Sequence, residues 1–288
     1  MFPALVDGIT VGALYALLAL GPSLVYGLLR VLDIANAAAL VLGAYIGVTL
    51  FQHGLPWWLG ALAGMAGSVI LGLLLQRFLY RPLLDQGPLV VLVASIGVFI
   101  AMEEAFRLIW KPYPRQFPVT VPLPHGTIAG TPVTGVQVLM LILGVVVLLG
   151  SWWVLGHTRL GFTWRATAQD RETARAMGVN VNRVVAGIFA AGYALAALAG
   201  VLFAIRYNTV TPDMGDVPAY KMLAIIVLGG LGNPMGTILA AFVIGLAESI
   251  VNTYWGFILP RDTIAFLVLI AILLIRPAGL LPKGLTRA

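Results

Sequence analysis

The sequence has no cysteine and few charged residues. Without cysteine, disulfides, thiolate metal sites and cysteine nucleophiles are excluded. Only 10% of the 288 residues are charged, whereas 60% are hydrophobic and the mean hydropathy is +1.00. Soluble domains carry about 25% charged residues, so the composition predicts an integral membrane protein.

Groups that carry catalysis or bind metals are also scarce. The three histidines, His53, His125 and His157, are far apart in the sequence. They form no H-E-x-x-H pair and no Ser/His/Asp grouping. We therefore expect no catalytic residues, no metal, no cofactor and no nucleic-acid partner, and we expect the chain not to be an enzyme.

Long apolar segments dominate the chain. A membrane-spanning helix needs about 20 apolar residues, and the opening segment lacks the basic start of a signal peptide, so we expect it to be retained as a span. The pattern predicts an all-α polytopic membrane protein with about eight transmembrane helices, one of them broken, in a single transmembrane domain over 1–288. The predicted segments are 3–29, 34–51, 57–79, 88–109, 135–155, 184–205, 218–254 as a broken pair, and 262–276.

The joints between these segments are rich in proline and glycine. The longest is "KPYPRQFPVTVPLPHGTIAGTPVTG", in which Val and Leu alternate with Pro and other turn-forming residues. This pattern is typical of an extended loop or a short hairpin.

The distribution of lysine and arginine predicts the orientation in the membrane. Alternating the segments leaves 11 of the 17 basic residues on one side and six on the other. Because cytoplasmic loops carry the excess, we expect the N-terminus outside, the C-terminus cytoplasmic, and Arg107 and Lys221 among the outer basic residues.

One polar stretch, "TRLGFTWRATAQDRETARAMGVNV" at 158–181, interrupts the apolar pattern. Residues 163–177 read as a short amphipathic helix that ends at Gly178. Winding it at 100° per residue groups Ala166, Asp170 and Ala174 on one face and Arg171 and Arg175 on the other. The stretch is either an interfacial anchor held by phosphate groups or a surface on which another protein docks.

This stretch and several others resemble a known family. It continues as "NRVV", and the chain also contains "LAGVLFA", "LGGLGNPMGTILAAFVIGLAES", "RPAGLLPKG", "YRPLL" and "GALYALLALGPSLVYGLLRVLDIANAAALVLGAY". These motifs are similar, in the same order, to the permease subunits of bacterial branched-chain amino acid ABC importers, the LivH/LivM type. The resemblance covers nearly the whole chain.

The resemblance implies a type II importer-like fold and a set of partners. It implies that 157–183 is a cytoplasmic coupling segment docking on an ATP-hydrolysing subunit in the bacterial inner membrane. The chain has no G-x-x-x-x-G-K-[ST] loop, so the ATPase must be another polypeptide. A second permease, identical or paralogous, an extracytoplasmic solute-binding protein, a small-molecule solute and membrane lipid are the other implied partners. The implied docking residues are Gly161, Arg165, Ala166, Asp170, Ala174 and Gly178.

Two stretches are candidates for the translocation pathway. "IIVLGGLGNPMG" carries four glycines, an asparagine and a proline, which favours unwound backbone at membrane depth. Gly232, Asn233 and Gly236 are its candidate lining residues, although close helix packing would also explain the glycines. In "LDIANAAALVLGAY", Asp33 reads as a helix N-cap and Asn36 could face the pathway.

At Asn36 the chain departs from its apparent family. The family commonly has phenylalanine-alanine-histidine-glycine where this chain has "IANA" from Ile34 to Ala37. A different solute is therefore open, with urea, short amides or carboxylates as alternatives to branched-chain or similar small hydrophobic amino acids.

Two more features of the sequence bear on the fold and the mechanism: an acidic residue inside an apolar segment and a weak internal repeat. Glu248 lies within an apolar segment and is either an interhelical partner or a pathway residue. A weak echo links "YALLALG" at 15–21 with "YALAALAG" at 193–200. The two segments would run in opposite directions, as an inverted repeat requires, although coincidence is also open because Leu and Ala are abundant. An ion-coupled secondary transporter is the alternative class, and Glu248 is its strongest candidate residue.

Overall fold

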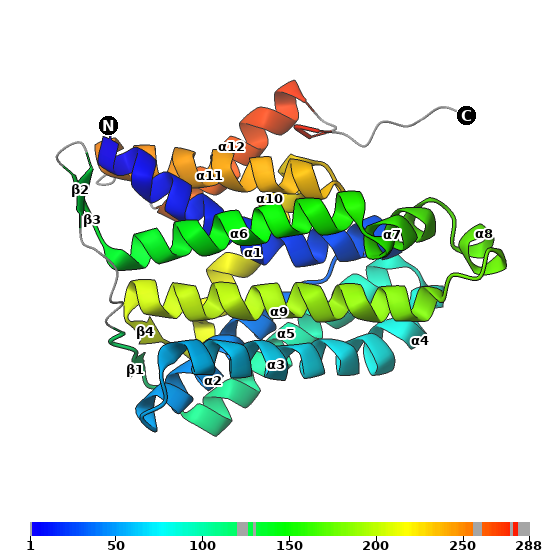
Figure 1. Ribbon diagram of the computed structural model, residues 1–288, viewed down its shortest axis with the longest axis horizontal. Helices are drawn as coiled ribbons and strands as arrows, with labels where there is room; N and C mark the ends of the chain where they lie inside the picture. Colours follow the sequence, from blue (N-terminus) through cyan, green and yellow to red (C-terminus); the bar gives the residue numbers. More distant parts are fainter. Residues whose placement is uncertain (1, 120–125, 129–130, 256–260, 277–278, 282–288) are drawn as a thin grey trace.

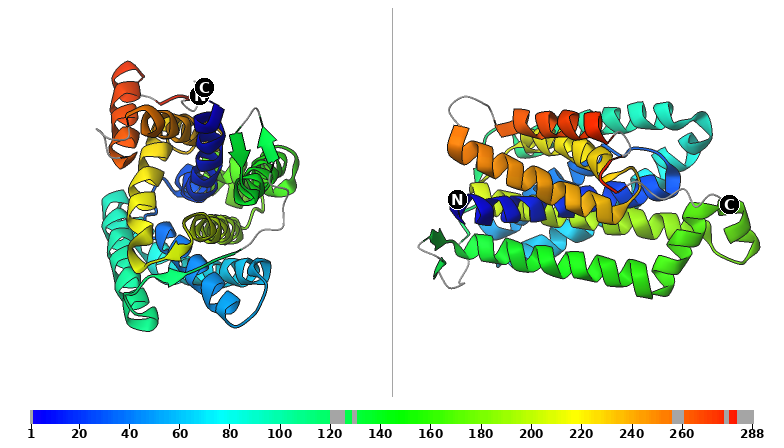
Figure 2. Two further views of the ribbon diagram at one scale, coloured as in Figure 1. Left: turned by 90° about the vertical axis from the view of Figure 1, so that its left-hand side faces the viewer. Right: turned by 90° about the horizontal axis from the view of Figure 1, so that it is seen from above.

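The computed structural model describes residues 2–119, 126–128, 131–255, 261–276 and 279–281. Its helices run close to the long axis of the molecule (Figure 1). Two short hairpin-like pairings and the start of the first helix lie at one end, which we call the strand end. Two short helices lie at the other end, which we call the α7–α8 end. Viewed along this axis, the helices form a bundle (Figure 2, left).

The first half of the chain supplies five of the main elements. Helix α3 continues through a π-helical segment, Gln76–Tyr80, into α4 and a 3₁₀ turn, Leu84–Gln86. The elements are α1 (Phe2–Leu29), α2 (Asn36–Gln52), α3 (Trp57–Leu75), α4 (Arg81–Leu83) and α5 (Pro88–Trp110).

The second half begins with the polar connection and ends with the last apolar helices. The elements are β1 (Arg115–Gln116), β2 (Gly126–Ile128), β3 (Thr131–Val133), α6 (Gly135–His157), α7 (Arg159–Gln169), α8 (Arg171–Ala176), α9 (Val181–Tyr207), β4 (Thr209–Val210), α10 (Asp216–Gly229), α11 (Pro234–Trp255) and α12 (Arg261–Ile275). A 3₁₀ turn, Pro212–Gly215, precedes α10.

The predicted apolar segments correspond closely to these helices. By length and composition, six helices of the described residues could cross a membrane, and α2 and part of α12 are shorter apolar helices. The broken pair expected in 218–254 is α10 followed by α11. The expected hairpin is β2 paired antiparallel with β3, while β1 pairs antiparallel with β4. The all-α polytopic fold is confirmed.

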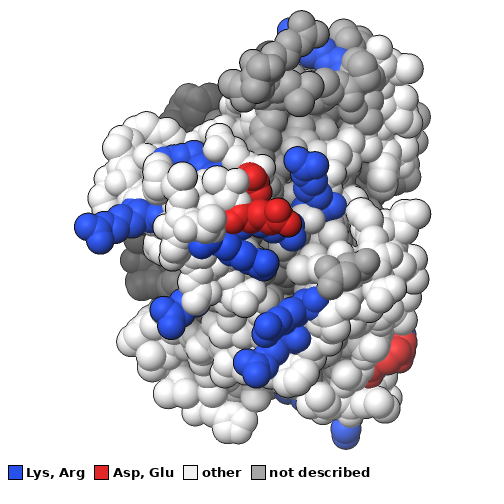
Figure 3. Space-filling view, turned by 90° about the vertical axis from the view of Figure 1, so that its right-hand side faces the viewer, with Lys and Arg blue, Asp and Glu red and all other residues white. Residues whose placement is uncertain are grey.

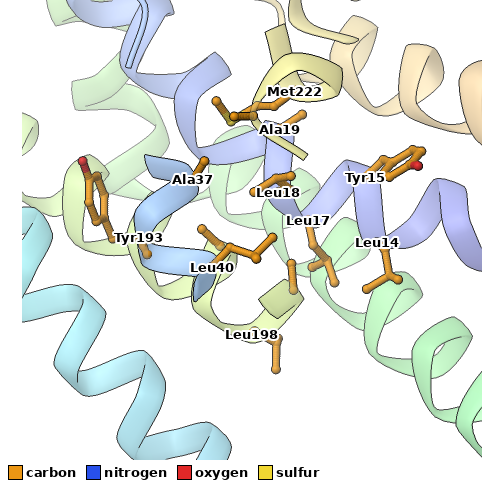
Figure 4. Close-up of a cluster of buried hydrophobic side chains, with 14 of the residues drawn as sticks. Leu14, Tyr15, Leu17, Leu18, Ala19, Ala37, Leu40, Tyr193, Leu198 and Met222 are labelled. Atoms are coloured by element: carbon orange, nitrogen blue, oxygen red, sulfur yellow. The ribbon is translucent and has the colours of Figure 1, made fainter. Parts of the chain in front are cut away.

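The core lies between α1, α2, α9 and α10. Their side chains interdigitate around Leu17, Leu40 and Met222, all of which are essentially inaccessible (Figure 4). The outward faces of α5 and α6 instead expose large apolar side chains, as expected for helices in contact with lipid. On α5 and α6 these are Leu89, Val90, Val93, Ile96, Ile100, Leu108, Ile109, Ile142, Val145, Val146, Leu149, Trp152 and Trp153.

Two helices cross at a point where no side chain would fit. A Cβ atom on Gly21 of α1 would lie 2.5 Å from Gly192 Cα on α9, and one on Gly192 would lie 2.9 Å from Gly21 Cα. Small residues allow helix backbones in a membrane to approach this closely. The crossing joins the first and second halves of the chain at the centre of the bundle.

The two halves follow one plan in opposite directions. In each, a long helix is followed by a connection without α-helix, a shorter helix and another long helix. Helix α1 runs away from the strand end, whereas α9 runs towards it (Figure 1). Across the halves, α1 packs on α11 and α9 packs on α3. The structure therefore supports the inverted repeat suggested by the echo. The three helices start at 2, 36 and 57 in one half and at 181, 216 and 234 in the other.

Candidate functional site

Two helices begin inside the bundle rather than at its ends. The backbone before α2 is anchored to the first half of α5, because the Ile34 N–H donates to Ser95 Oγ at 3.4 Å. The turn before α10 reaches the same helix, since a Cβ atom on Gly215 would lie 3.3 Å from Phe99 Cε2. Both starts therefore meet at mid-bundle depth. Irregular backbone at such depth is typical of places that line a cavity or bind solute.

The connection between α1 and α2 buries a carboxylate. Asp33 is fully inaccessible, and its Oδ1 accepts hydrogen bonds from the Tyr80 hydroxyl, the Tyr193 hydroxyl at 3.3 Å and the Asn36 N–H at 3.2 Å. Although Ala35 is the boundary residue of α2, Asp33 thus binds the first N–H of the helix, as an N-cap side chain does. The sequence did not identify Tyr80 and Tyr193 as its partners.

Polar atoms without a partner lie beside this carboxylate. Among the described residues, neither Asp33 Oδ2 nor the Asn36 side-chain amide has a hydrogen-bond partner, and Asn36 is also fully inaccessible. Buried polar atoms are normally hydrogen-bonded, because leaving one without a partner costs about 1–3 kcal/mol. The start of α2 therefore offers an acceptor and an amide to a small polar ligand or to water. The pathway role of Asp33 and Asn36 stays a prediction that this geometry supports.

A second buried polar cluster joins α1, α10 and α11. Lys221 Nζ lies 2.9 Å from Glu248 Oε1 and donates to Tyr15 Oη at 2.8 Å, and Tyr15 donates to Glu248 Oε2 at 2.9 Å. Lys221 and Glu248 are 3% and 0% exposed, so the two charges neutralise each other inside the bundle. Glu248 is thus an interhelical partner, and a pathway role for it stays a prediction.

The placement of Lys221 among the outer basic residues is wrong. Helix α10 begins at Asp216 inside the bundle, so Lys221 lies within it and not in a loop. The position of Lys221 in an apolar run indicates a buried, paired cation, but the sequence does not indicate which acid neutralises it.

Gly232 and Asn233 lie in the turn between α10 and α11, and Gly236 lies in the first turn of α11. Gly232 has φ +77° and packs so closely that a Cβ atom would lie 2.9 Å from Gly27 Cα in the last turns of α1. Asn233 caps α11 by accepting from the Gly236 N–H at 3.2 Å, and it donates to the Leu281 carbonyl at 2.8 Å. The expected helix break is present, and it lies at the α7–α8 end beside the last turn of α1; unwound backbone at membrane depth stays a prediction. A pathway role for the three residues stays a prediction.

The polar stretch folds as two helices, not as one. The expected helix 163–177 breaks at Asp170, whose backbone is extended at φ −151° and ψ 118°. The reason is local: Asp170 Oδ1 accepts from the Glu172 N–H at 2.8 Å and the Thr173 N–H at 3.3 Å, which starts α8. A hydrogen bond from the Thr173 hydroxyl, together with these two N–H bonds, holds the pKa of Asp170 below its ordinary value. Gly178, at φ +86°, follows the last turn of α8.

Both short helices are fastened to the bundle. The Trp164 indole donates to the Leu24 carbonyl at 3.4 Å, and Arg171 donates to the Leu28 carbonyl at 2.6 Å, so α7 and the start of α8 lie against the last turns of α1. A displacement of these helices would therefore move α1.

The six predicted docking residues divide between the interior and the surface. Gly161 and Ala174 are buried, Ala166 is half-buried, and Arg165, Asp170 and Gly178 are exposed. The Arg165 side chain donates to the Leu155 carbonyl. A partner docking here would thus meet the exposed three, whereas Gly161 and Ala174 shape the surface from below.

The α7–α8 end is strongly basic. Arginine side chains spread over this face, with a small acidic group among them (Figure 3). Exposed arginines at the ends of α1, α3 and α9 and along α7 and α8 supply the charge. They are Arg30, Arg77, Arg81, Arg159, Arg165, Arg175 and Arg183.

Comparisons with known proteins agree over nearly the whole length. The family model "Branched-chain amino acid transport system / permease component" matches residues 4–276. The high-affinity branched-chain amino acid transport system permease protein BraD of Pseudomonas aeruginosa is 32% identical over 294 residues, covering 97% of this chain and 95% of that protein. LivH of Escherichia coli K12, with the same description, is 28% identical over 96% of this chain and 94% of its own length.

Two further relatives match over a smaller share of the chain. A probable branched-chain amino acid permease, LivH of Methanocaldococcus jannaschii, is 27% identical over 93% of this chain and 88% of its own length. The ribose import permease RbsC of E. coli K12 is 29% identical over 47% of this chain and 46% of that protein. No solved structure matches. The full-length match and the multi-pass helical fold together show that this chain belongs to the branched-chain amino acid transport system permease family.

Proposed function

We propose that this chain is the transmembrane permease subunit of an ATP-driven importer that takes up branched-chain or similar small hydrophobic amino acids. The observation that carries the proposal is the family match over 4–276, with relatives of that description aligned over nearly their full length. The chain would work in the bacterial inner membrane with separate ATPase subunits, a second permease and an extracytoplasmic binding protein, and would carry no catalytic residues itself.

The two short helices α7 and α8 (residues 159–176), which we call the α7–α8 hairpin, are the proposed contact with the ATPase. Arg165 and Asp170 are exposed at the tip of the molecule, while Trp164 and Arg171 fasten the same helices to α1. A push on the hairpin would thus reach the bundle as a rigid displacement. Because the chain has no cysteine, an Arg165→Cys variant would carry one reactive thiol. Disulfide cross-linking to single-cysteine ATPase variants tests the contact, and Tyr113→Cys at the strand end is the control.

The junction of the α2 and α10 starts is the proposed solute pathway. Asp33 Oδ2 could accept hydrogen bonds from an ammonium group, and the N-terminal ends of α2 and α10 favour a carboxylate. The surrounding Leu, Ala and Val side chains suit an apolar amino acid. The high-affinity step would belong to the binding protein, so the junction needs only to pass the solute.

The proposed orientation puts the α7–α8 end in the cytoplasm, the N-terminus outside and the C-terminus inside. The excess of arginine at that end supports it. Single-cysteine variants Glu172→Cys and Tyr113→Cys, labelled in intact cells with an impermeant maleimide, provide the test. Labelling of Tyr113→Cys alone is expected, and labelling of Glu172→Cys alone would reverse the orientation.

Reconstitution tests the function as a whole. Proteoliposomes with the permease pair, ATPases and binding protein are expected to accumulate radiolabelled leucine only with ATP. Retention of urea, a short amide or a carboxylate by the binding protein, with no leucine uptake, would change the solute. Uptake by the permease alone under a proton or sodium gradient would favour a secondary transporter, although Glu248, its strongest candidate, is paired with Lys221.

A further inference from the structure

A basic pocket lies between α3 and α9 at the α7–α8 end. Side chains from the last turn of α3, the π-helical segment, α4 and the first turns of α9 line it. The main lining residues are Leu73, Gln76, Arg77, Arg81, Asn182 and Arg183. None of these residues belongs to the proposed solute pathway or to the proposed ATPase contact, so the proposed function does not account for the pocket.

The three arginines of this pocket have no acidic partner in the part of the chain that the structure describes. Arg77, Arg81 and Arg183 are all exposed, and the ion pairs of the described residues lie elsewhere in the bundle. Arginines that line one pocket repel one another. Their placement is therefore favourable when an anion lies among them, and guanidinium groups bind phosphate oxygens in a bidentate way.

The pocket changes from apolar to basic along the helix axis. Leu73, Arg77 and Arg81 follow one another at four-residue spacing, so the pocket wall passes from an aliphatic side chain to two cations within about 12 Å. On α9, Ala186 lies on the apolar side and Arg183 on the basic side. A phospholipid has this polarity, with an acyl chain below a phosphate.

The surface beside the pocket is suited to acyl chains. Leu74 is 48% exposed and Phe78 is 71% exposed, and both lie in the same stretch of α3 and the π-helical segment. Large apolar side chains at such exposure, next to arginines at a helix end, are typical of the boundary between hydrocarbon and headgroups. A free phosphate ion would use the arginines but not this neighbouring apolar surface.

The π-helical segment sets this geometry. Gln76–Tyr80 turns Arg77 outward while Tyr80 is fully buried and donates to Asp33. Wide turns of this kind occur often at functional sites. The pocket wall and the buried carboxylate are thus connected through five residues.

We propose that this pocket binds the phosphate headgroup of an anionic phospholipid, with Arg77, Arg81 and Arg183 as its ligands and Gln76 and Asn182 as additional hydrogen-bond donors. The acyl chains would lie against Leu73, Leu74 and Phe78. Basic pockets between transmembrane helices on the cytoplasmic side bind anionic headgroups in this way.

Native mass spectrometry of the full-length chain tests the proposal. The protein, with any subunits it retains, is taken from nanodiscs of equal parts phosphatidylglycerol and phosphatidylcholine. We expect enrichment of bound phosphatidylglycerol, and a decrease of about fivefold for each of Arg77→Gln, Arg81→Gln and Arg183→Gln, since each cation contributes about 1 kcal/mol. Arg159→Gln, an exposed arginine outside the pocket, is the matched control and should keep the enrichment.

The other occupants give different results. Equal enrichment in the triple variant and the wild type would overturn the proposal. Stabilisation of the protein in pure phosphatidylcholine nanodiscs by inorganic phosphate, lost in the triple variant, would assign the pocket to a free anion instead. Loss of ATPase co-purification with unchanged lipid enrichment would assign it to a protein contact. If the triple variant does not fold, the three single variants provide the same comparison.

Discussion

Lys221 on α10 and Glu248 on α11 form an ion pair of 2.9 Å inside the bundle, and Tyr15 of α1 contacts both. The pair fixes the relative position of three helices that belong to both halves of the inverted repeat. Both charges are buried away from water, so each one is stabilised only as long as the opposite charge is present.

Removing one member of this pair is expected to destabilise the protein strongly. Lys221→Met or Glu248→Gln leaves the partner without its countercharge, and such changes cost about 3–5 kcal/mol. Lys221→Met with Glu248→Leu should cost much less than the two single changes together. Chemical denaturation in mixed micelles gives the three free energies. Additive effects would show that the pair contributes no coupling.

Asn36→Leu is expected to lower solute uptake without lowering the stability of the protein. The Asn36 amide has no partner among the described residues, so its replacement by an apolar group of similar size should leave the unfolding free energy nearly unchanged. If the amide binds passing solute, uptake should decrease by about ten- to a hundredfold, which corresponds to one hydrogen bond to a charged group.

The matched control for Asn36→Leu is Ser68→Ala. Ser68 is also buried, but its hydroxyl donates to the Ala39 carbonyl at 3.2 Å, so it is already satisfied within the bundle. Its loss should slightly lower stability and leave uptake intact. Uptake by Asn36→Leu equal to that of the wild type would remove Asn36 from the pathway.

How well each feature could be predicted depends on whether the local sequence or the tertiary packing determines it. The ends of the long helices were predicted to within a few residues, because unbroken apolar runs and Pro–Gly joints set them locally. The starts of α2 and α10 were also predicted to within two residues, but their position inside the bundle was not, since it depends on packing against Ser95 and Phe99 of α5. The break at Asp170 had a local signal, an Asp three residues before a Thr in Asp-Arg-Glu-Thr, that the helical periodicity obscured. The acid that neutralises Lys221 lies 27 positions away in the chain, which no local pattern indicates.

Close packing of α9 on α2 predicts a sharp difference between two glycines. A Cβ atom on Gly200 would lie 1.9 Å from the Leu40 carbonyl oxygen, whereas one on Gly187 would have open space. Gly200→Ala should therefore lower the melting temperature by several degrees, since backbone must move. Gly187→Ala should leave it unchanged or raise it, because alanine favours helices over glycine. A melting curve for each in the same detergent decides the point, and equal curves would contradict this packing.

The cap of α8 predicts a response to acid. Its hydrogen bonds hold the pKa of Asp170 below its ordinary value of 3.8, so the bonds to Glu172 and Thr173 stabilise the hairpin fully above about pH 5. This stabilisation is lost as the pH falls through the lowered pKa, because the protonated carboxyl is a weaker acceptor. Hydrogen exchange of the Glu172 and Thr173 amides should accelerate in acid, relative to intrinsic rates, in the wild type. In Asp170→Asn the amide oxygen still caps the helix but does not titrate, so protection should be independent of pH. In Asp170→Ala protection should be low throughout, and a pH response there would show that another group controls α8.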